Sequence, residues 1–433
     1  MNINIEEALQ LFRTDSPRLT RTERYYRGEH DLAFASEKFQ NTFGTLFREF
    51  ALNLCPAICD AIKDKLKITG FRVESAVENG TGDISTDVAS IWQRNRMAAR
   101  SDEVHKEALK NGDSYVIVWP GADGNATLFP NAAADVLVVY DDEDAGRILW
   151  AAKRWRTRAS YLRLNLFYPD RIEKYISTRA SESFLPDPKD MVPITDDPSI
   201  VPNPYNVVPV FHFANNADIG TLGRSELEPA IPIQDGLNKS VLDMLVAMEF
   251  SAYRQRWAAG IEIEYDSDGR PAAPFTAGID HLWISENPNT RFGDFDTASL
   301  DQFLKVKDSF RIDMASVTGT PLYYLMPQTG GFPSGESLRK AETRFIAKVR
   351  DRQQAFGQVW ADAMRFAARV EGIGDIRLSA AWEDPSPLTE RELLENILLK
   401  RQIGISGEQA LHEAGYGPVD ISQMSAERSG RSN

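Results

Sequence analysis

The chain has 433 residues, with 63 acidic and 49 basic side chains, a formal charge of −14 and a pI of about 5.0. Hydrophobic residues make up 42% and charged residues 26%, ordinary values for folded proteins, so the bulk of the chain is not disordered. The acidic balance excludes a tight non-specific nucleic-acid binder, because such binding needs Lys and Arg to replace phosphate counterions, but light contact with DNA stays open. The length predicts two to four structural units.

The sequence carries no signal for membrane insertion or export. The first ten residues, MNINIEEALQ, lack the basic and apolar regions of a signal peptide. The richest apolar run, Leu242 to Phe250, is interrupted by two acids and is far shorter than the ~18–20 residues that span a bilayer. We expect a soluble protein made in the cytoplasm. The two cysteines, Cys55 and Cys59, are expected to be small buried hydrophobes in a reducing compartment.

The first half of the chain predicts helices followed by antiparallel strands, that is, an α+β pattern. The helices are expected over 4–17, 21–26, 46–67 with a kink or break at Pro56, and 86–110. The strands are expected over 115–119, 136–140, 148–155, 164–168, 172–176 and 207–213, with 180–206 as a surface loop.

The second half predicts two long helices around a small insert. The helix over 227–257 carries an apolar stripe at steps of four, three and four, formed by Leu237, Val241, Met244 and Met248. An insert with short strands at 261–265 and 281–284 follows, and then a helix over 299–318. After a turn-rich loop come a very long helix over 335–371, a strand over 376–382, and helices over 390–401 and 406–414.

A search for catalytic motifs finds no phosphate-binding loop, no dinucleotide fingerprint and no zinc-protease motif. The acidic run 141–144 is expected to be a solvated hairpin tip. Glu262 and Glu264 share one face of an expected strand but have no nearby Lys or His to complete a nuclease site. The basic run formed by Lys153, Arg154, Arg156 and Arg158 could meet nucleic acid, although pairing with carboxylates of the chain is favoured. We predict no catalytic site, cofactor or metal.

The five histidines are scattered along the chain and are expected to be surface or satisfied core residues. They are His30, His105, His212, His281 and His412.

Short segments between about residues 20 and 420 have a characteristic order. They are RYYRGE at 24–29, NLCPAI at 53–58 leading to Gly70-Phe71, WQRN at 92–95, ALKNGDSYVIV at 108–118, NVVPV at 206–210, GRSEL at 223–227, IQDGLNK at 233–239, TGTPL at 318–322 and SGES at 334–337. Their order and spacing together, more than any single motif, resemble the portal proteins of tailed bacteriophages, in particular those of long-tailed phages that infect actinobacteria.

The resemblance implies the α+β portal fold and divides the chain into parts. These would be a wing over 1–225, a first stem helix over 226–258, a small α/β clip over 259–296, a second stem helix over 297–318, a tunnel loop over 319–334, a long wing helix over 335–371 and a helical crown over 372–433. The apolar stripe of the first stem helix would pack between subunits. The channel-facing loop residues would be Tyr323, Met326, Gln328, Thr329, Gly330, Gly331 and Phe332, which carry no charge.

The resemblance also implies a role and partners. Family members form a homo-oligomeric ring, a dodecamer, at one capsid vertex of the virion. Double-stranded DNA passes through it, without sequence specificity, during packaging and ejection. The ring would dock the terminase large subunit and later the head–tail adaptor, and would contact capsid and scaffolding proteins. The alternatives are another structural head protein, such as an adaptor or minor capsid protein, and a metal-dependent nuclease that uses Glu262 and Glu264.

Overall fold

The structure is a computed structural model. It describes residues 3–35, 52–76, 84–144, 146–182, 185–252, 256–260, 288–294, 301–326, 335–386 and 390–414, and the isolated residues 37, 40, 41, 421 and 424. Helices and strands are mixed, as the sequence predicts. The chain divides into two compact units: residues 1–31, 51–235 and 311–433 form the first, and residues 32–50 and 236–310 form the second.

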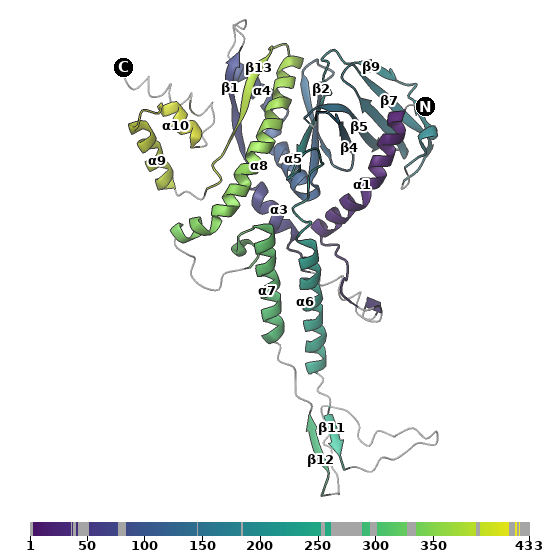
Figure 1. The fold of residues 1–433 in the computed structure, drawn as a ribbon, viewed down its shortest axis with the longest axis vertical. Helices are drawn as coiled ribbons and strands as arrows, with labels where there is room; N and C mark the ends of the chain where they lie inside the picture. The colour runs from purple at the N-terminus through teal and green to yellow at the C-terminus, as the bar shows by residue number, and fades with distance from the viewer. Residues whose placement is uncertain are drawn as a thin grey trace. The chain divides into compact units, whose positions relative to one another are not determined.

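The described part of the first unit contains three antiparallel sheets (Figure 1). The two-stranded sheet pairs β1 (Ile68–Ala76) with β13 (Ile376–Trp382), and the three-stranded sheet has the order β10 (Val210–Ala214), β2 (Asp113–Pro120), β3 (Ala126–Ala132). The largest sheet has the order β4 (Val136–Tyr140), β5 (Ile148–Arg156), β6 (Tyr161–Phe167), β7 (Arg171–Ala180) and β8 (Met191–Pro193), with β9 (Ile200–Pro202) also paired to β7.

The main core lies between helices and the three-stranded sheet. The long helix α8 (Gly335–Val370) and helix α5 (Met97–Asn111) pack against β2 and β10, and α8 also packs against β13. Trp360 of α8 is fully buried, with its ring centroid 4.7 Å from that of Phe213 on β10. Because α8 joins the apolar residues of strands far apart in sequence, this core ties the C-terminal half of the chain to the N-terminal half.

The largest sheet has apolar residues on both faces, each against a different partner. One face, with Trp150, Leu164 and Leu166, packs against Leu9 and Phe12 of α1 (Ile3–Arg27). The opposite face packs against the three-stranded sheet and forms a second core with it, to which Tyr115, Ile117, Val138, Phe167 and Ile172 contribute. The two cores arise because successive strand residues point to opposite faces of a sheet.

The described part of the second unit consists mainly of segments of two helices and a short hairpin. Helices α6 (Ile231–Ala252) and α7 (Asp301–Thr318) each cross the boundary between the units. They pack closely, since a Cβ atom placed on Gly236 of α6 would lie 2.8 Å from the Phe310 ring of α7. Strand β11 (Arg256–Ala259) pairs antiparallel with β12 (Arg291–Asp294).

Most of the predicted elements are present. The strands predicted around residues 117, 138, 152, 166 and 174 occur as β2, β4, β5, β6 and β7, and the acidic run lies between β4 and β5. The predicted strand over 376–382 is β13, and the long helix predicted over 335–371 is α8. The predicted C-terminal helices occur as α9 (Glu390–Gln402) and α10 (Gly407–Glu413).

One predicted helix boundary near a proline is wrong, and a predicted break near another is confirmed. The break at Pro17 is absent, and α1 runs through it. Residues Leu9 and Phe12 before this proline and Tyr25 after it are all buried, so packing on both sides outweighs the backbone hydrogen bond that Pro17 cannot donate. The helix predicted over 46–67 is broken near Pro56, as expected: residues 52–54 are not helical, and α3 (Cys55–Lys63) begins with Pro56 in its first turn, where a proline is favoured.

Three further predictions need correction. The helix predicted over 86–110 is two helices, α4 (Ile84–Arg94) and α5, separated at Arg96, whose φ of 54° is left-handed. The loop predicted over 180–206 contributes β8 and β9 to the largest sheet, since short edge strands give little sequence signal. The helix predicted to reach Trp257 ends at Ala252, and Trp257 lies in β11. The strands predicted at 261–265 and 281–284 lie outside the described residues.

Candidate functional site

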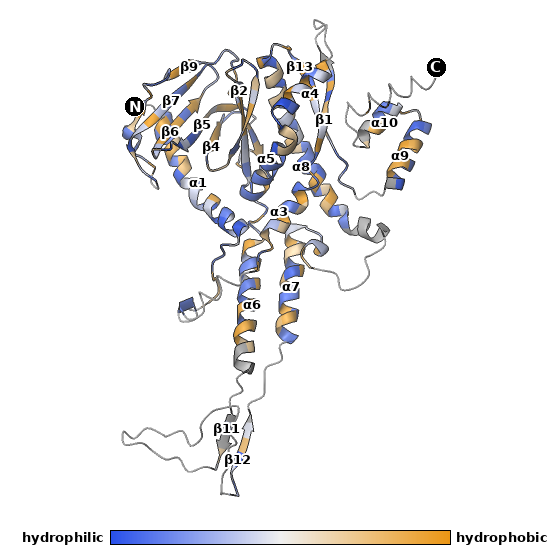
Figure 2. Ribbon diagram, turned by 180° about the vertical axis from the view of Figure 1, so that it is seen from behind, coloured by the Kyte–Doolittle hydropathy of each residue, from blue (hydrophilic) through white to orange (hydrophobic). Residues whose placement is uncertain are grey.

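The apolar stripe of α6 is progressively more exposed along the helix. Leu237 and Val241 are buried within the single chain, Met244 is partly exposed, and Met248 is 46% exposed. The stripe predicted for contacts between copies therefore divides into two parts. Its first half is already buried in the isolated chain, whereas its second half is available to another molecule. Figure 2 shows hydrophobic segments on both α6 and α7.

Helix α7 carries apolar side chains that the single chain leaves in solvent. Leu304, Val306, Ile312 and Val317 are each more than 40% exposed. The side of the same helix that faces the protein carries Met314 and Thr318, which are both buried. A helix whose apolar residues lie both on its buried face and beyond it has more apolar surface than one chain covers.

The segment after α7 begins at a glycine and then packs against other parts of the first unit. Gly319 adopts φ +68°, a conformation that ends a helix and that other residues rarely adopt. Leu325 is buried in a small core with Met314, Ala230 and Ile58. Of the predicted tunnel-loop residues, Tyr323 and Met326 are partly buried here, and the others lie outside the described residues: Gln328, Thr329, Gly330, Gly331 and Phe332.

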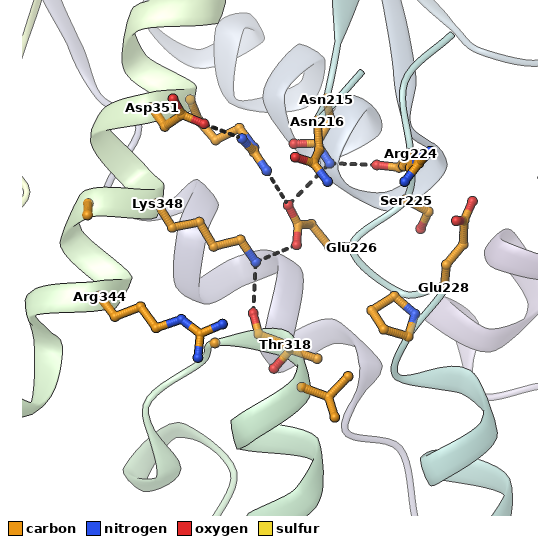
Figure 3. A pocket seen from close by; sticks show the side chains of 15 residues that line it. Asn215, Asn216, Arg224, Ser225, Glu226, Glu228, Thr318, Arg344, Lys348 and Asp351 are labelled. Carbon is orange, nitrogen blue, oxygen red and sulfur yellow. Dashed lines mark hydrogen bonds and ion pairs between the residues drawn. The ribbon is translucent and has the colours of Figure 1, made fainter. Parts of the chain in front are cut away.

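A buried ionic cluster joins three segments of the first unit (Figure 3). Glu226, just before α6, accepts hydrogen bonds from Lys348 at 2.5 Å and from Arg352 at 3.3 Å, both on α8. Lys348 also donates to the backbone oxygen of Thr318 at 2.8 Å. A cation at the C-terminal end of α7 is favourable because the last carbonyl groups of a helix are unpaired and partly negative. The cluster thus fixes the ends of both α6 and α7 to α8.

An open cavity of about 750 Å³ lies beside this cluster. Arg224, Glu228, Arg344 and Asp351 line its rim, and Figure 3 shows them around Glu226 and Lys348. Its charges are of both signs, so it has neither the apolar lining typical of small-molecule sites nor a concentrated field for one ion. We interpret the cluster as a structural junction.

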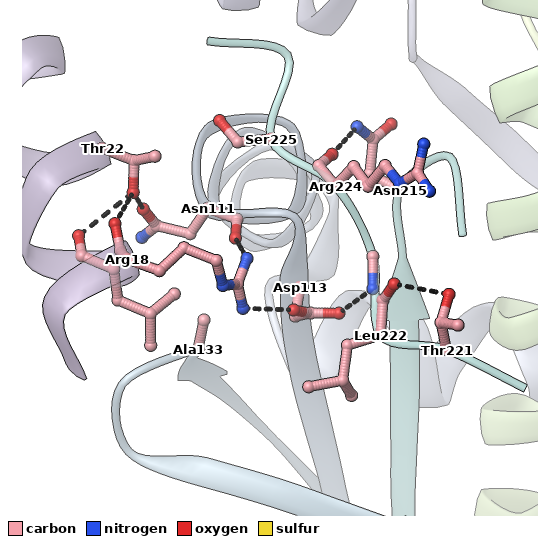
Figure 4. Close-up of polar contacts among 12 residues, drawn as sticks. Arg18, Thr22, Asn111, Asp113, Ala133, Asn215, Thr221, Leu222, Arg224 and Ser225 are labelled. Carbon is pink, nitrogen blue, oxygen red and sulfur yellow. Dashed lines mark hydrogen bonds and ion pairs between the residues drawn. The ribbon is translucent and has the colours of Figure 1, made fainter. Parts of the chain in front are cut away.

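A second buried carboxylate organises the start of β2 (Figure 4). Asp113 is 2% exposed and accepts hydrogen bonds from Arg18 at 3.1 Å and from the backbone N–H of Gly223 at 2.6 Å, and it bonds the His212 ring at 2.8 Å. Gly223 is required here, because a Cβ atom on it would lie 2.0 Å from the carbonyl oxygen of Gly112. This contact connects α1, β2, β10 and the segment leading to α6.

Sequence reasoning missed both carboxylates. The available signal was the glycine beside each of them in the chain, Gly112 before Asp113 and Gly223 near Glu226. Such glycines indicate a close approach of two backbones. The sequence alone does not show that the two backbones approach each other.

The sequence also singled out two cysteines, the histidines and two glutamates. Cys55 and Cys59 are free and buried, as predicted, and burial raises the pKa of the Cys55 thiol to about 12. His105 is fully buried and accepts a hydrogen bond from the indole N–H of Trp360 at 2.9 Å, and burial lowers its pKa to about 3. Glu262 and Glu264 lie outside the described residues.

The basic run is divided between the two faces of β5 and forms no single patch. Arg154 lies 4.4 Å from the centroid of the Phe12 ring and donates to the Ala134 carbonyl oxygen, while Arg156 donates to that of Ser181. Lys153 points to the opposite face and lies over the Trp155 ring at 5.6 Å. Arg154 is thus held by the Phe12 ring and a backbone oxygen.

Within the part of the chain that the structure describes, no group of three or more His, Cys, Asp or Glu is placed to hold a metal ion. In the same described ranges no helix is long and apolar enough to cross a membrane.

Comparison with known proteins gives relatives from two mycobacterial phages. The chain is 31% identical over 237 residues to the portal protein of Mycobacterium phage L5, which covers 52% of this chain and 49% of that protein. The chain thus spans about half the length of this relative. It is 24% identical over 386 residues to the portal protein of Mycobacterium phage D29, covering 84% of this chain and 76% of that protein.

Similar solved structures come from gene transfer agent particles. A chain in the neck of an empty particle aligns with 81% of this chain and 86% of its own length, with a TM-score of 0.47 and 14% identity. A chain in the neck of a native particle aligns with 87% and 91%, with a TM-score of 0.47 and 13% identity. These similarities are loose and add nothing to the assignment.

The family comparison covers nearly the whole chain. A family model described as phage portal protein, SPP1 Gp6-like, matches residues 9–414. This match includes both units, the helix pair α6 and α7, and the segments whose order suggested the resemblance. The resemblance is confirmed, and the chain belongs to the phage portal protein family of the SPP1 Gp6-like type.

Proposed function

We propose that copies of this chain assemble head to tail into a closed ring, a dodecamer, at one vertex of a phage capsid. Double-stranded DNA passes through the ring during packaging and ejection. The ring is a structural component of the virion, with no catalytic site, cofactor or metal of its own. A head-to-tail interface repeated around a closing rotation gives such a ring, and it requires two different complementary surfaces on each copy.

The observation that carries this proposal is the placement of exposed apolar residues on α7. At about 100° per residue in a helix, Val306 and Val317 lie within about 20° of each other. Leu304 and Ile312 lie within about 80° of each other, and the centres of the two pairs are separated by about 170°. Helix α7 thus has two apolar edges on opposite sides, one for each neighbour in a ring. The exposed half of the α6 stripe, Met244 and Met248, extends this surface.

The charge and the loop also fit a channel that DNA slides through. A net charge of −14 repels phosphates, whereas a channel lined by Lys and Arg would retain the duplex. We assign residues 319–334 to the tunnel loop, and its uncharged side chains would contact the duplex without holding it. Deleting Gln328 to Phe332 should leave assembly intact and reduce the packaged genome length; a normal length would contradict this role.

The remaining parts and partners follow the family. Residues 1–225 and 335–371 form the wing, 226–258 and 297–318 the stem, 259–296 the clip and 372–433 the crown. The clip would dock the terminase large subunit during packaging and the head–tail adaptor afterwards. The wing and crown would contact capsid and scaffolding proteins.

Substitution of one residue on an apolar edge of α7 tests whether this edge closes the ring. Val306→Asp places a charge on an apolar edge that the single chain leaves exposed, so the protomer should fold normally but fail to close rings. Multi-angle light scattering of the purified protein should show smaller species. The matched control is Ser309→Asp, which adds the same charge to the exposed face between the two edges and should leave rings intact. Intact rings of Val306→Asp would overturn the interface.

A further inference from the structure

A small cavity is lined by residues of both the three-stranded sheet and the largest sheet, next to their shared core. Its volume is about 240 Å³. Its floor is formed by Ile117, Phe167 and Ile172, which belong to that core. The cavity therefore continues this buried interior to the surface, and all of its lining residues belong to the first unit.

The walls combine aromatic rings with two amines, those of Lys153 and Lys174. Trp119 and Phe129 come from the three-stranded sheet, and Trp155 and Lys153 come from β5. Residues 151, 153 and 155 of β5 point to the same face of the sheet, because successive strand residues alternate between the two faces. Ala151 belongs to the shared core, whereas Lys153 and Trp155 line the cavity. Phe129 is 40% exposed, so the rim of the cavity presents apolar surface to solvent.

Lys153 is the unusual group in this cavity. Its side chain is partly buried and its ammonium lies 5.6 Å from the centroid of the Trp155 ring. Burial lowers its pKa, and Asp135 acts in the opposite direction through space. Among the residues that the structure describes, no carboxylate oxygen lies within 4.0 Å of this ammonium. A half-buried cation without an ion pair is costly, and an incoming anion would reduce that cost.

The neighbouring cations differ from Lys153 because each has its own acid. Arg163 pairs with Asp196 at 3.0 Å, and Lys174, which also lines the cavity, pairs with Asp197. Two of the three cations on this face of the sheet are thus paired with an aspartate of the same chain. Lys153, the one directed at the aromatic walls, is available to a partner that brings a negative charge.

The size of the cavity limits what it can hold. Sites for drug-sized ligands have volumes of about 300–1,000 Å³, so 240 Å³ suits a single large side chain. Aromatic side chains that fill such pockets contribute much of the binding energy of protein interfaces. We propose that this cavity is a docking site for an acidic segment of another polypeptide. One aromatic side chain of that segment fills the cavity, and an adjacent carboxylate pairs with Lys153.

A single nucleic-acid strand is the competing occupant, since its bases also stack on aromatic rings. Binding of this kind uses a row of cations that follows the backbone phosphates. Here two of the three cations on the sheet face are already paired, so the face offers no such row. Charge complementarity therefore favours a short acidic peptide, which needs only one cation. The proposal does not depend on ring formation.

The proposal is tested by binding of three blocked tripeptides to the full-length chain, measured by saturation-transfer difference NMR. The peptides are acetyl-Asp-Phe-Asp-amide, acetyl-Asn-Phe-Asn-amide and acetyl-Lys-Phe-Lys-amide. We expect the acidic peptide to bind at least fivefold more tightly than the neutral one, and the basic peptide to bind most weakly. Equal affinities for the three, or no binding of the acidic peptide, would overturn the proposal.

Substitutions of residues that line the cavity test whether the peptide binds there. Lys153→Met, or Lys153→Gln if the first variant is unfolded, should reduce the affinity for the acidic peptide to that for the neutral peptide. Phe129→Ser should weaken both. The matched control Lys189→Met removes an exposed lysine elsewhere in the same unit and should change neither. Unchanged affinity for the acidic peptide in both Lys153 variants, or tighter binding of a four-nucleotide deoxythymidine strand than of the acidic peptide, would contradict the proposal.

Discussion

The sheets of the first unit and the helix pair α6 and α7 differ in how far their side chains are paired or covered within one chain. In the first unit, Asp113 and Glu226 are buried charges that are hydrogen-bonded to other groups of the same chain. Along α7, by contrast, large apolar side chains such as Val306 and Ile312 stay in solvent. The first region is complete in one copy, whereas the second has a surface that only another molecule can cover.

This difference indicates where a substitution should act. A change in the first unit should alter the free energy of unfolding of each protomer. A change on the exposed edges of α7 should alter assembly and leave that free energy nearly constant. The predictions below test this separation, beginning with the largest expected effect.

Removing the buried carboxylate of β2 should be the most damaging change. Asp113→Ala leaves Arg18 and the Gly223 N–H without their acceptor in a site that is 2% exposed. We expect a loss of about 3–5 kcal/mol in the free energy of unfolding, measured by urea titration. Asp142→Ala, at the exposed turn between β4 and β5, is the control and should change it by less than about 0.5 kcal/mol. Similar effects of the two variants would show that the buried network is not a stabilising feature.

The ionic cluster between α8 and the ends of α6 and α7 should be the next most sensitive. Glu226→Gln keeps the size of the side chain but removes the negative charge that Lys348 and Arg352 share, and it leaves Arg352 its ion pair with the more exposed Asp351. We expect a loss of about 2–3 kcal/mol, measured in the same way. Glu228→Gln, an exposed neighbour on the rim of the same cavity, should have little effect. If Glu226→Gln is as stable as the parent protein, the cluster does not fix the helix ends.

The core of the first unit should also give a pH dependence. Burial lowers the pKa of His105 to about 3, against about 6.5 in the unfolded chain. The unfolded state therefore binds a proton between pH 6.5 and 3 that the folded state does not, so this contribution to stability is lost as the pH falls through that range. Between pH 7 and pH 5 the loss should be about 2 kcal/mol. It should be absent in His105→Gln, as measured by urea unfolding at both pH values; the same pH dependence in both proteins would refute it.

The smallest effect on protomer stability is expected on α7. Val306→Asp, which should abolish ring closure, changes a residue that is 43% exposed in the single chain. Its free energy of unfolding under dilute conditions that keep the protein monomeric should be within about 0.5 kcal/mol of the parent value. A loss of several kcal/mol would mean that this edge is covered within one chain, and the contrast between the two regions would then disappear.

Elements with strong periodicity or a clear end signal were predicted from the sequence. Strand β13 and the helix α8 are examples, and Gly319 ends α7 as expected. Predictions were wrong where tertiary packing decides. The buried residues on both sides of Pro17 keep α1 continuous, and β8 and β9 form only because β7 is there to pair with them.

The candidate site was predicted less completely than the fold. The α6 stripe is a real apolar face, but its first two residues, Leu237 and Val241, are covered by the chain itself. Periodicity identifies an apolar face without indicating what covers it. The edges of α7 were not predicted because Val306 and Val317 are isolated among polar residues in the sequence. They align only on the helix surface.

Electron microscopy of the purified full-length chain tests the central claim most directly. The account predicts closed rings of identical copies with a central opening wide enough for duplex DNA, and it predicts that Val306→Asp, but not Ser309→Asp, abolishes them. A chain that stays a compact monomer at every concentration, with no central opening, would contradict the account.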